Sequence, residues 1–298
     1  MSGTDMEQCA VPVAGGELFV ARWGSGPPVL AVHGITGSHA SWTWVADALT
    51  GRVSFIAPDL RGRGASNALL GPFGMVAHAA DLVAVLDHFE LSGAVVVGHS
   101  MGAWVGATLA ARHLDRVRSL ILVDGGVPQK LPDGVDLETH AAAVLGPALS
   151  RLDMTFPSET AYLDYWRAHP AFAAPGAWDA HLEHYARWDL DGEAPQLRPR
   201  PSREAATTDL RDLLGEAGLD CRRVRSPVRL MRAPRGLLNQ PEPLLSDESV
   251  AKQLPTIPGA RYEMVEGTNH YTIVMGVGAP VVADRILAAV QATADPAS

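Results

Sequence analysis

Cysteine is scarce in this chain of 298 residues: there are two, Cys9 and Cys221, and they lie far apart in the sequence. A disulfide framework and a cysteine-based metal cluster are therefore both unexpected, and a reducing compartment is the simpler environment. Basic residues are in the minority, with 24 Lys and Arg against 33 Asp and Glu. Because nucleic acids and anionic membranes are bound through basic faces, neither is an expected partner.

Long apolar segments are lacking as well. No apolar run reaches the ~18 residues that a membrane-spanning helix requires. Residues 1–10 include acidic side chains and no apolar stretch of the kind found in a secretion signal. We therefore expect a soluble, cytoplasmic protein. Hydrophobic residues nevertheless make up 47% of the chain, so a large core can form, in one large α/β domain or two smaller ones.

Short apolar runs alternate with helix-like segments in two parts of the chain. The expected strands cover residues 11–13, 17–24, 29–32, 53–57, 95–97, 117–123, 227–231 and 261–265, and the expected helices between them cover 41–49, 75–90, 103–113, 245–254 and 280–292. This alternation predicts an α/β fold with a mainly parallel sheet covered by helices on both faces.

The alternation stops after Gly126. From there to about residue 219 we find helical patterns at 137–152, 158–168 and 178–188, separated by prolines, and no convincing strand. The sequence therefore predicts a first part of an α/β core (1–126), a helical cap inserted into it (127–220), and a second part of the core (221–298).

The segment Gly98-His99-Ser100-Met101-Gly102 joins one predicted strand to a helix. Gly-x-Ser-x-Gly in this context is typical of a nucleophile elbow, a sharp strained turn that exposes the serine hydroxyl above the sheet. Residues two positions to either side must lack bulk, and Gly98 and Gly102 meet that need. The alternative is a glycine-rich turn with an incidental serine, but the flanking strand and helix favour Ser100 as a nucleophile.

An activated serine needs a base within hydrogen-bond reach and a third group that orients the base. Of the eleven histidines, His270 follows the last predicted strand, at the same carboxyl edge of the sheet as Ser100. We predict that His270 is the base, the alternative being a loop histidine with a structural hydrogen bond. His33 and His99 also lie on this edge; we expect His33 to shape its loop and His99 to point away from Ser100.

Residues 11–126 and 222–292 resemble the α/β-hydrolase superfamily. The motifs that carry the resemblance stand in family order: His33-Gly34, the D-x-R-G-x-G-x-S turn from Asp59 to Ser66, the Gly98–Gly102 elbow, and Asn269-His270. The resemblance implies the α/β-hydrolase fold, with residues 127–220 as its helical cap. Asp59 and Arg61 are expected to be structural, tying their loop to its neighbours.

The acid of the predicted triad departs from the commonest family pattern. Many members carry it in a Gly-x-x-Asp loop after strand seven, but residues 231–240 contain no carboxylate here. Asp124 ends the preceding strand on the correct edge, and some branches, including the fungal zearalenone lactonases, place their acid after strand six. We predict Asp124 as the acid and keep Glu242 as the fallback. The structural alternative for Asp124 is an ordinary Asp-Gly turn.

Two backbone N–H groups, of Ile35 and Met101, are expected to form an oxyanion hole. The site needs no cofactor or metal, and the sequence shows no ligand cluster for one. Three aromatic residues of the predicted cap, Trp188, Trp166 and Tyr185, could line an apolar pocket, although aromatic residues on a helix face more often pack in a core.

These residues predict a serine hydrolase that cleaves a carboxylic ester or lactone of a small, largely apolar substrate through an acyl-enzyme. A C–C bond hydrolase, an amidase and an acyltransferase use the same triad and stay open. The alternative from another class is a hydrolase-like receptor that binds its ligand without turnover. A small molecule is the expected partner, and the sequence does not indicate the oligomeric state.

Overall fold

The computed structural model of this protein describes residues 6–129, 131 and 133–294. Eight strands form one sheet in the order β1-β2-β4-β3-β5-β6-β9-β10. They are β1 (Met6–Val13), β2 (Gly16–Trp23), β3 (Pro28–Val32), β4 (Ser54–Pro58), β5 (Ala94–His99), β6 (Val117–Val123), β9 (Val228–Arg232) and β10 (Arg261–Met264). The pairs β1–β2 and β2–β4 are antiparallel and all the others are parallel. The predicted, mostly parallel sheet is confirmed.

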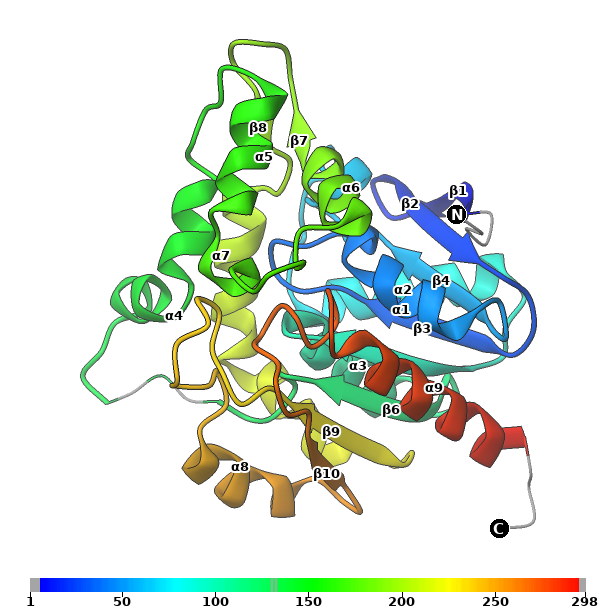
Figure 1. Ribbon diagram of the computed structural model, residues 1–298. Coiled ribbons are helices and arrows are strands. Elements are labelled where there is room, and N and C mark those ends of the chain that lie inside the picture. Colours follow the sequence, from blue (N-terminus) through cyan, green and yellow to red (C-terminus); the bar gives the residue numbers. More distant parts are fainter. Residues whose placement is uncertain (1–5, 130, 132, 295–298) are drawn as a thin grey trace.

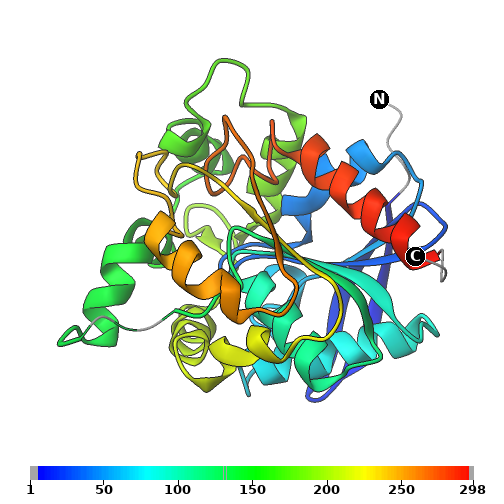
Figure 2. The same cartoon turned by 90° about the horizontal axis from the view of Figure 1, so that it is seen from below.

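Helices cover both faces of this sheet (Figures 1 and 2). One face carries α2 (Met75–His88) and α3 (Met101–Arg112), and the other carries α1 (Thr43–Leu49) and α9 (Ala279–Ala294); α8 (Asp247–Gln253) precedes the edge strand β10. In β3, Leu30 and Val32 belong to the first core and Val29 and Ala31 to the second. The strand is therefore apolar throughout because both of its faces are buried.

Between β6 and β9 lies a helical insertion, which stands over one end of the sheet in Figure 1. It contains α4 (Leu137–Arg151), α5 (Glu159–Arg167), α6 (Ala180–Trp188) and α7 (Arg203–Leu213), with a ribbon of two residues per strand formed by β7 (Leu190–Asp191) and β8 (Arg198–Pro199). Short 3-10 helices occur along the chain: η1 (His39–Trp42), η2 (Gly64–Ser66), η3 (Pro170–Phe172), η4 (Glu216–Arg223) and η5 (Leu254–Thr256).

The sequence did not predict α7 or the β7–β8 ribbon. The ribbon is too short to show an alternating pattern, so the expectation of no strand in this region was wrong. Helix α7 follows a proline-rich joint and is capped by Ser202, whose hydroxyl accepts a hydrogen bond from Ala205 N at 3.2 Å. Three of its buried residues, Ala205, Ala206 and Asp209, are small or charged, so few large apolar side chains marked the helix in the sequence.

The carboxyl ends of β3, β5 and β6 lie side by side at one edge of the sheet. From β3 the order runs to β4 on one side and β5 on the other, so the edge between β3 and β5 is a topological switch point, where ligands bind in open α/β sheets. Within the described ranges, no helix has both the length and the apolar composition needed to cross a bilayer.

Candidate active site

Ser100 occupies a strained turn between β5 and α3. Its φ of 54° and ψ of −125° lie outside the regions that L-residues favour, at a cost of about 1–3 kcal/mol. Its backbone N–H donates to the carbonyl of Val123 in the neighbouring β6 at 2.9 Å, which holds the turn against the sheet. The following residue begins α3, so the Ser100 side chain stands at the positive end of a helix dipole.

Two positions around this turn have no space for any side chain beyond glycine, because neighbouring backbone atoms lie too close. A Cβ built on Gly98 would lie 2.2 Å from the carbonyl oxygen of Gly102, and one on Gly102 would lie 2.1 Å from the carbonyl oxygen of Val32. The strand, the turn and the helix start therefore approach through backbone alone. This is the physical reason for Gly-x-Ser-x-Gly here.

A Gly102→Ala variant is expected to lose about 3 kcal/mol or more of unfolding free energy, because the new methyl group meets backbone that cannot move aside. Urea unfolding followed by circular dichroism measures the loss. Gly146→Ala is the matched control: Gly146 lies within α4 and has no atom within 4 Å of a built Cβ. Gly146 directly precedes Pro147, whose ring disfavours a Cβ on a helical residue before it, and this offsets the usual gain from Gly to Ala; the change should alter the unfolding free energy by no more than about 1 kcal/mol. Equal effects of the two changes would contradict this account of the turn.

His270 and Asp124 are joined by a short hydrogen bond. The distance between His270 Nδ1 and Asp124 Oδ2 is 2.7 Å, and the Asp124 side chain is fully buried. Asp124 Oδ1 accepts a second hydrogen bond, from Ala233 N at 3.1 Å. Glu242, by contrast, is exposed. The structure thus places Asp124, and not Glu242, against the imidazole.

The loop that carries His270 is held by its neighbours. The side-chain oxygen of Asn269 accepts from the N–H groups of Tyr271 and Thr272 at 3.0 and 2.9 Å. Its amide nitrogen donates to the carbonyl of Ala171 in the helical insertion at 2.8 Å. These bonds fix the start of the loop and tie it to the insertion.

His99 was expected to point away from Ser100 and to have a packing role, and the structure shows that it packs against His270. Its ring lies 4.7 Å from the His270 ring, centroid to centroid, and its Nε2 donates to the His270 carbonyl at 2.8 Å. Burial lowers the pKa of His99 well below its ordinary value, so the ring stays neutral and serves as a fixed donor. Its place immediately before Ser100 was the only sequence signal, and that signal does not reveal a contact with a loop 171 residues away.

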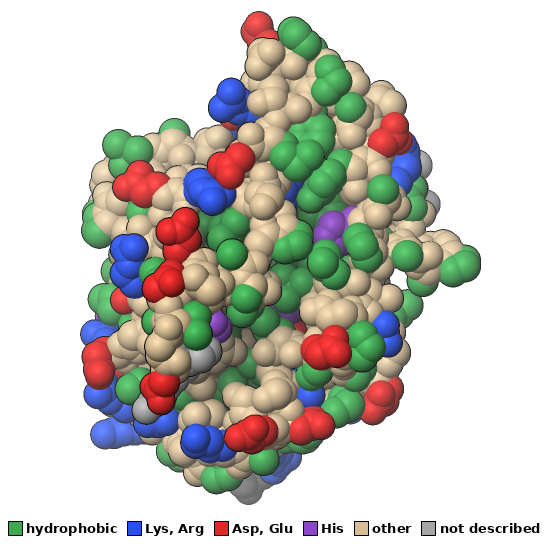
Figure 3. Space-filling view, turned by 90° about the vertical axis from the view of Figure 1, so that its left-hand side faces the viewer, with side chains coloured by type: hydrophobic (Ala, Val, Ile, Leu, Met, Phe, Trp, Pro, Cys, Tyr) green, Lys and Arg blue, Asp and Glu red, His purple; other side chains and the backbone are tan. Residues whose placement is uncertain are grey.

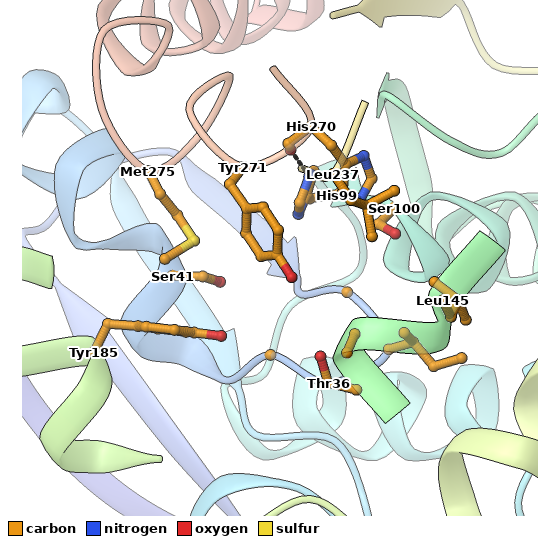
Figure 4. Close-up of a pocket in the computed structure, with 14 residues that line it drawn as sticks. Thr36, Ser41, His99, Ser100, Leu145, Tyr185, Leu237, His270, Tyr271 and Met275 are labelled. Carbon is orange, nitrogen blue, oxygen red and sulfur yellow. Dashed lines mark hydrogen bonds between the residues drawn. The ribbon is translucent and has the colours of Figure 1, made fainter. Parts of the chain in front are cut away.

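Ser100 and His270 line the same pocket, shown in Figure 4. The pocket encloses about 420 Å³, including its open mouth, and lies between the β3 loop, the insertion and the His270 loop. Figure 3 shows the surface hollowed on this side of the molecule, with hydrophobic side chains gathered around the hollow. In the described part of the chain no hydrogen bond joins Ser100 Oγ to His270; such bonds often tighten only when substrate binds.

The predicted oxyanion-hole donors flank Ser100. Neither Ile35 N–H nor Met101 N–H donates to another described residue, so both are free to bind an oxygen. The Ile35 loop is fixed from behind by His33, whose Nε2 accepts from Leu60 N at 2.9 Å while its Nδ1 donates to the Gly34 carbonyl at 2.8 Å. Burial lowers the pKa of His33 to about 4, and the neutral ring can make both bonds.

Arg63 connects this loop to the helical insertion. The fully buried guanidinium donates to the Ile35 carbonyl at 3.0 Å and pairs with Asp209 of α7 at 2.6 Å. Asp209 also accepts from His78 Nε2 at 2.9 Å. Burial alone would raise the pKa of Asp209, but attraction to Arg63 and His78 outweighs it and lowers that pKa to about 2. A charge on the insertion therefore supports the loop that carries Ile35, one of the two predicted oxyanion-hole residues.

Asp209 is expected to contribute about 2 kcal/mol to the unfolding free energy at pH 5, and this contribution should be lost as the pH drops below 2. The folded protein holds this pKa near 2, whereas the unfolded chain has the ordinary value of 3.8, so acid protonates the unfolded state first. Urea unfolding at a series of pH values measures the slope. Asp209→Asn should lower the unfolding free energy by about 3 kcal/mol at neutral pH, and in this variant the unfolding free energy should change less with pH. An unchanged pH dependence would contradict the lowered pKa of Asp209.

The three aromatic residues that could line the pocket, according to the sequence, have different positions. Tyr185 lines the pocket, but Trp166 and Trp188 do not. Trp166 is 1% exposed and packs against Tyr185 inside the insertion. The indole of Trp188 donates to Asp59 at 3.0 Å and packs edge-on against His39. These two tryptophans hold the insertion together and attach it to the core, as helix-face aromatics more often do.

The buried loop from Asp59 onward, the Ser100 turn and the His270–Asp124 pair stand together at the switch point of the sheet. A family model described as the alpha/beta hydrolase fold matches residues 27–173. The chain belongs to the α/β-hydrolase superfamily. This membership supports a hydrolase activity.

In the described ranges, no three His, Cys, Asp or Glu side chains are grouped to hold a metal ion.

Two curated relatives have informative names. The chain is 29% identical over 262 residues to RutD of Caulobacter segnis, whose name describes a carbamate hydrolase; the match covers 87% of this chain and 86% of RutD. It is 36% identical over 142 residues to the lipase LipV of Mycobacterium tuberculosis, covering 46% of this chain and 54% of LipV. The chain spans 40% of the length of other curated relatives, which are uncharacterized mycobacterial proteins.

Among solved structures, E-2-(acetamidomethylene)succinate hydrolase superimposes with a TM-score of 0.78 at 24% sequence identity. The alignment covers 96% of this chain and all of that one. At this identity the likeness establishes the fold alone, and that fold is the α/β-hydrolase fold.

Proposed function

We propose that this protein is a serine hydrolase of carboxylic esters or lactones, acting through Ser100, His270 and Asp124. The observation that carries the proposal is the 2.7 Å contact between His270 Nδ1 and the buried Asp124 carboxylate, beside a serine on a strained elbow. The relative named as a lipase supports ester chemistry. Residues 127–220 act as a cap that completes the pocket with side chains such as Leu145 and Tyr185.

In the first half of the reaction, Ser100 Oγ attacks the carbonyl carbon while His270 Nε2 takes the hydroxyl proton. The carbonyl oxygen becomes an oxyanion held by the Ile35 and Met101 N–H groups. The tetrahedral intermediate then collapses: the bond to the leaving alcohol breaks, the alcohol takes the proton from His270, and an ester of Ser100 with the acyl group remains.

In the second half, His270 takes a proton from water as the water oxygen attacks the acyl carbon. Collapse returns the proton to Ser100 Oγ and releases the carboxylic acid. Throughout, Asp124 accepts a hydrogen bond from His270 Nδ1–H. This bond keeps Nε2 free to receive a proton and stabilises the imidazolium that forms in each half-reaction.

Steady-state turnover of p-nitrophenyl esters of increasing chain length, and of a macrocyclic lactone, tests the proposal together with labelling by a fluorophosphonate. Turnover with labelling at Ser100 is the expected result. Labelling without turnover would instead describe a ligand-binding protein and would overturn the proposal.

A carbamate is the second candidate substrate, because the similarity to RutD extends over 87% of the chain. A carbamate carbonyl can be attacked by the same serine. A p-nitrophenyl carbamate assayed in parallel with the matching ester decides between the two: the higher kcat/KM identifies the preferred class.

A further inference from the structure

Three hydroxyl groups gather in the pocket at a distance from the reacting groups. They belong to Thr36 in the loop after β3, Tyr185 on α6 and Tyr271, which follows His270. Figure 4 shows the three hydroxyl oxygens facing a common space, with Ser100 on the other side of the pocket. None of these side-chain hydroxyls has a hydrogen-bond partner among the described residues, and none is among the buried side-chain atoms that lack one, so all three oxygens open onto the pocket.

Hydroxyls that open onto a pocket are hydrogen-bonded by water until a bound molecule with a suitable oxygen displaces that water. A packing role would have favoured phenylalanine at the two tyrosine positions. Three hydroxyls that converge on one space, each without a protein partner, therefore indicate a place where a bound molecule offers an oxygen.

The two phenols are donors at any ordinary pH. Burial raises the pKa of Tyr271 to about 12 and raises the pKa of Tyr185 well above its usual value. Each hydroxyl therefore keeps its proton and can give it to an acceptor.

The acceptor is uncharged. None of the fourteen residues that line the pocket is Lys, Arg, Asp or Glu. The nearby Arg151 is already satisfied, since it pairs with the buried Asp189 and donates to Tyr162 Oη at 2.6 Å and to the Thr36 carbonyl at 3.5 Å. A carboxylate placed here would have no free cation to balance it, which makes its burial expensive.

A second pocket, of about 350 Å³ including its open mouth, also borders Ser100. It shares Ile35, Ser100 and Leu145 with the first pocket and is otherwise lined mainly by apolar side chains such as Trp104, Leu210 and Leu213. Ser100 thus lines both a pocket with hydroxyl groups and a mainly apolar one.

We propose that Tyr185, Tyr271 and Thr36 form a subsite for a second, uncharged carbonyl oxygen of the substrate, so that the enzyme prefers oxo-esters whose other half is apolar. This inference rests on the proposed ester-hydrolase function. It adds a substrate class: esters or lactones with a ketone or second ester carbonyl a few bonds from the one that is cleaved.

Matched esters test the subsite from both sides of the scissile bond. The acyl pair is p-nitrophenyl 4-oxopentanoate and p-nitrophenyl pentanoate, and the alcohol pair is 4-oxopentyl butanoate and pentyl butanoate. In at least one pair the wild-type kcat/KM should be about 10-fold higher for the oxo member. Tyr185→Phe and Tyr271→Phe should each lower that ratio about 5-fold. Measuring the ratio within each pair cancels any general loss of activity.

Tyr165→Phe is the control, since it removes a phenol from the same insertion outside the pocket lining. It should leave the ratio unchanged. Equal kcat/KM within both pairs, or a preference that the two variants do not alter, would overturn the subsite while leaving the hydrolase intact. A Tyr-dependent preference for p-nitrophenyl monosuccinate over both oxo-esters would overturn the uncharged acceptor. Failure of the wild type to cleave any of these esters would instead refute the proposed function itself.

Discussion

Replacement of Ser100 by alanine is expected to lower kcat for a short p-nitrophenyl ester by about 10⁴-fold or more, because no other group can form the acyl-enzyme. The residual rate should come from binding and the oxyanion-hole donors alone. Ser100 Oγ makes no hydrogen bond to another described residue, so the unfolding free energy should change by no more than about 1 kcal/mol. Steady-state kinetics and urea unfolding of the same preparation measure both quantities.

Labelling by a fluorophosphonate should disappear in the same variant. Ser41 provides a matched control, since it is a second serine of the pocket whose hydroxyl donates to the Ser38 carbonyl at 2.7 Å. Ser41→Ala should remain labelled. Activity of Ser100→Ala near the wild-type level would show that the nucleophile lies elsewhere.

Local patterns were sufficient to predict the sheet and most of the helices. The central strands contain apolar runs, such as residues 29–32 in β3, 95–97 in β5 and 120–123 in β6, because they are buried on both faces, and such runs are visible without any tertiary information. The Ser100 elbow could also be predicted, because the turn requires glycine at fixed positions. Helix α7 and the β7–β8 ribbon lack comparable local signals, and they were missed.

Partners that are distant in the sequence could not be predicted in the same way. Trp188 was a candidate for the pocket, with packing in a core as the commoner role of a helix-face aromatic; its indole donates to Asp59, 129 residues away. The contact of His99 with the His270 carbonyl was likewise invisible. In each case the side chain's chemistry was evident, but only the packing of the insertion and the loops selects which of several acceptors it meets.

The helical insertion contributes more than a cover for the pocket. Asp209 from α7 neutralises Arg63, and Arg63 in turn donates to the Ile35 carbonyl. Movement of α7 away from the core would leave a buried guanidinium without its counter-ion, at a cost of about 3–5 kcal/mol. We therefore expect α7 to stay attached during substrate entry, so that any opening involves other parts of the insertion.

Asp124→Asn is expected to lower kcat by about 10⁴-fold, the loss known when the corresponding acid of a serine protease is changed in this way. The geometry gives the reason. Asp124 accepts two hydrogen bonds, from Ala233 N and from His270 Nδ1. An asparagine has one oxygen, and when that oxygen accepts from Ala233 its amide nitrogen faces the imidazole and donates to it. The histidine proton then moves to Nε2, where it blocks removal of the Ser100 proton.

Glu242→Gln distinguishes this triad from the alternative acid. Glu242 is exposed and makes no hydrogen bond to another described residue, so its substitution should change kcat less than twofold. If Glu242→Gln were the more damaging of the two, Glu242 would have to be the acid, reached through a rearrangement of the loop after β9. The buried, doubly bonded Asp124 argues for the opposite ranking, because a carboxylate without solvent is retained only where its partners satisfy it, and here one of those partners is the imidazole.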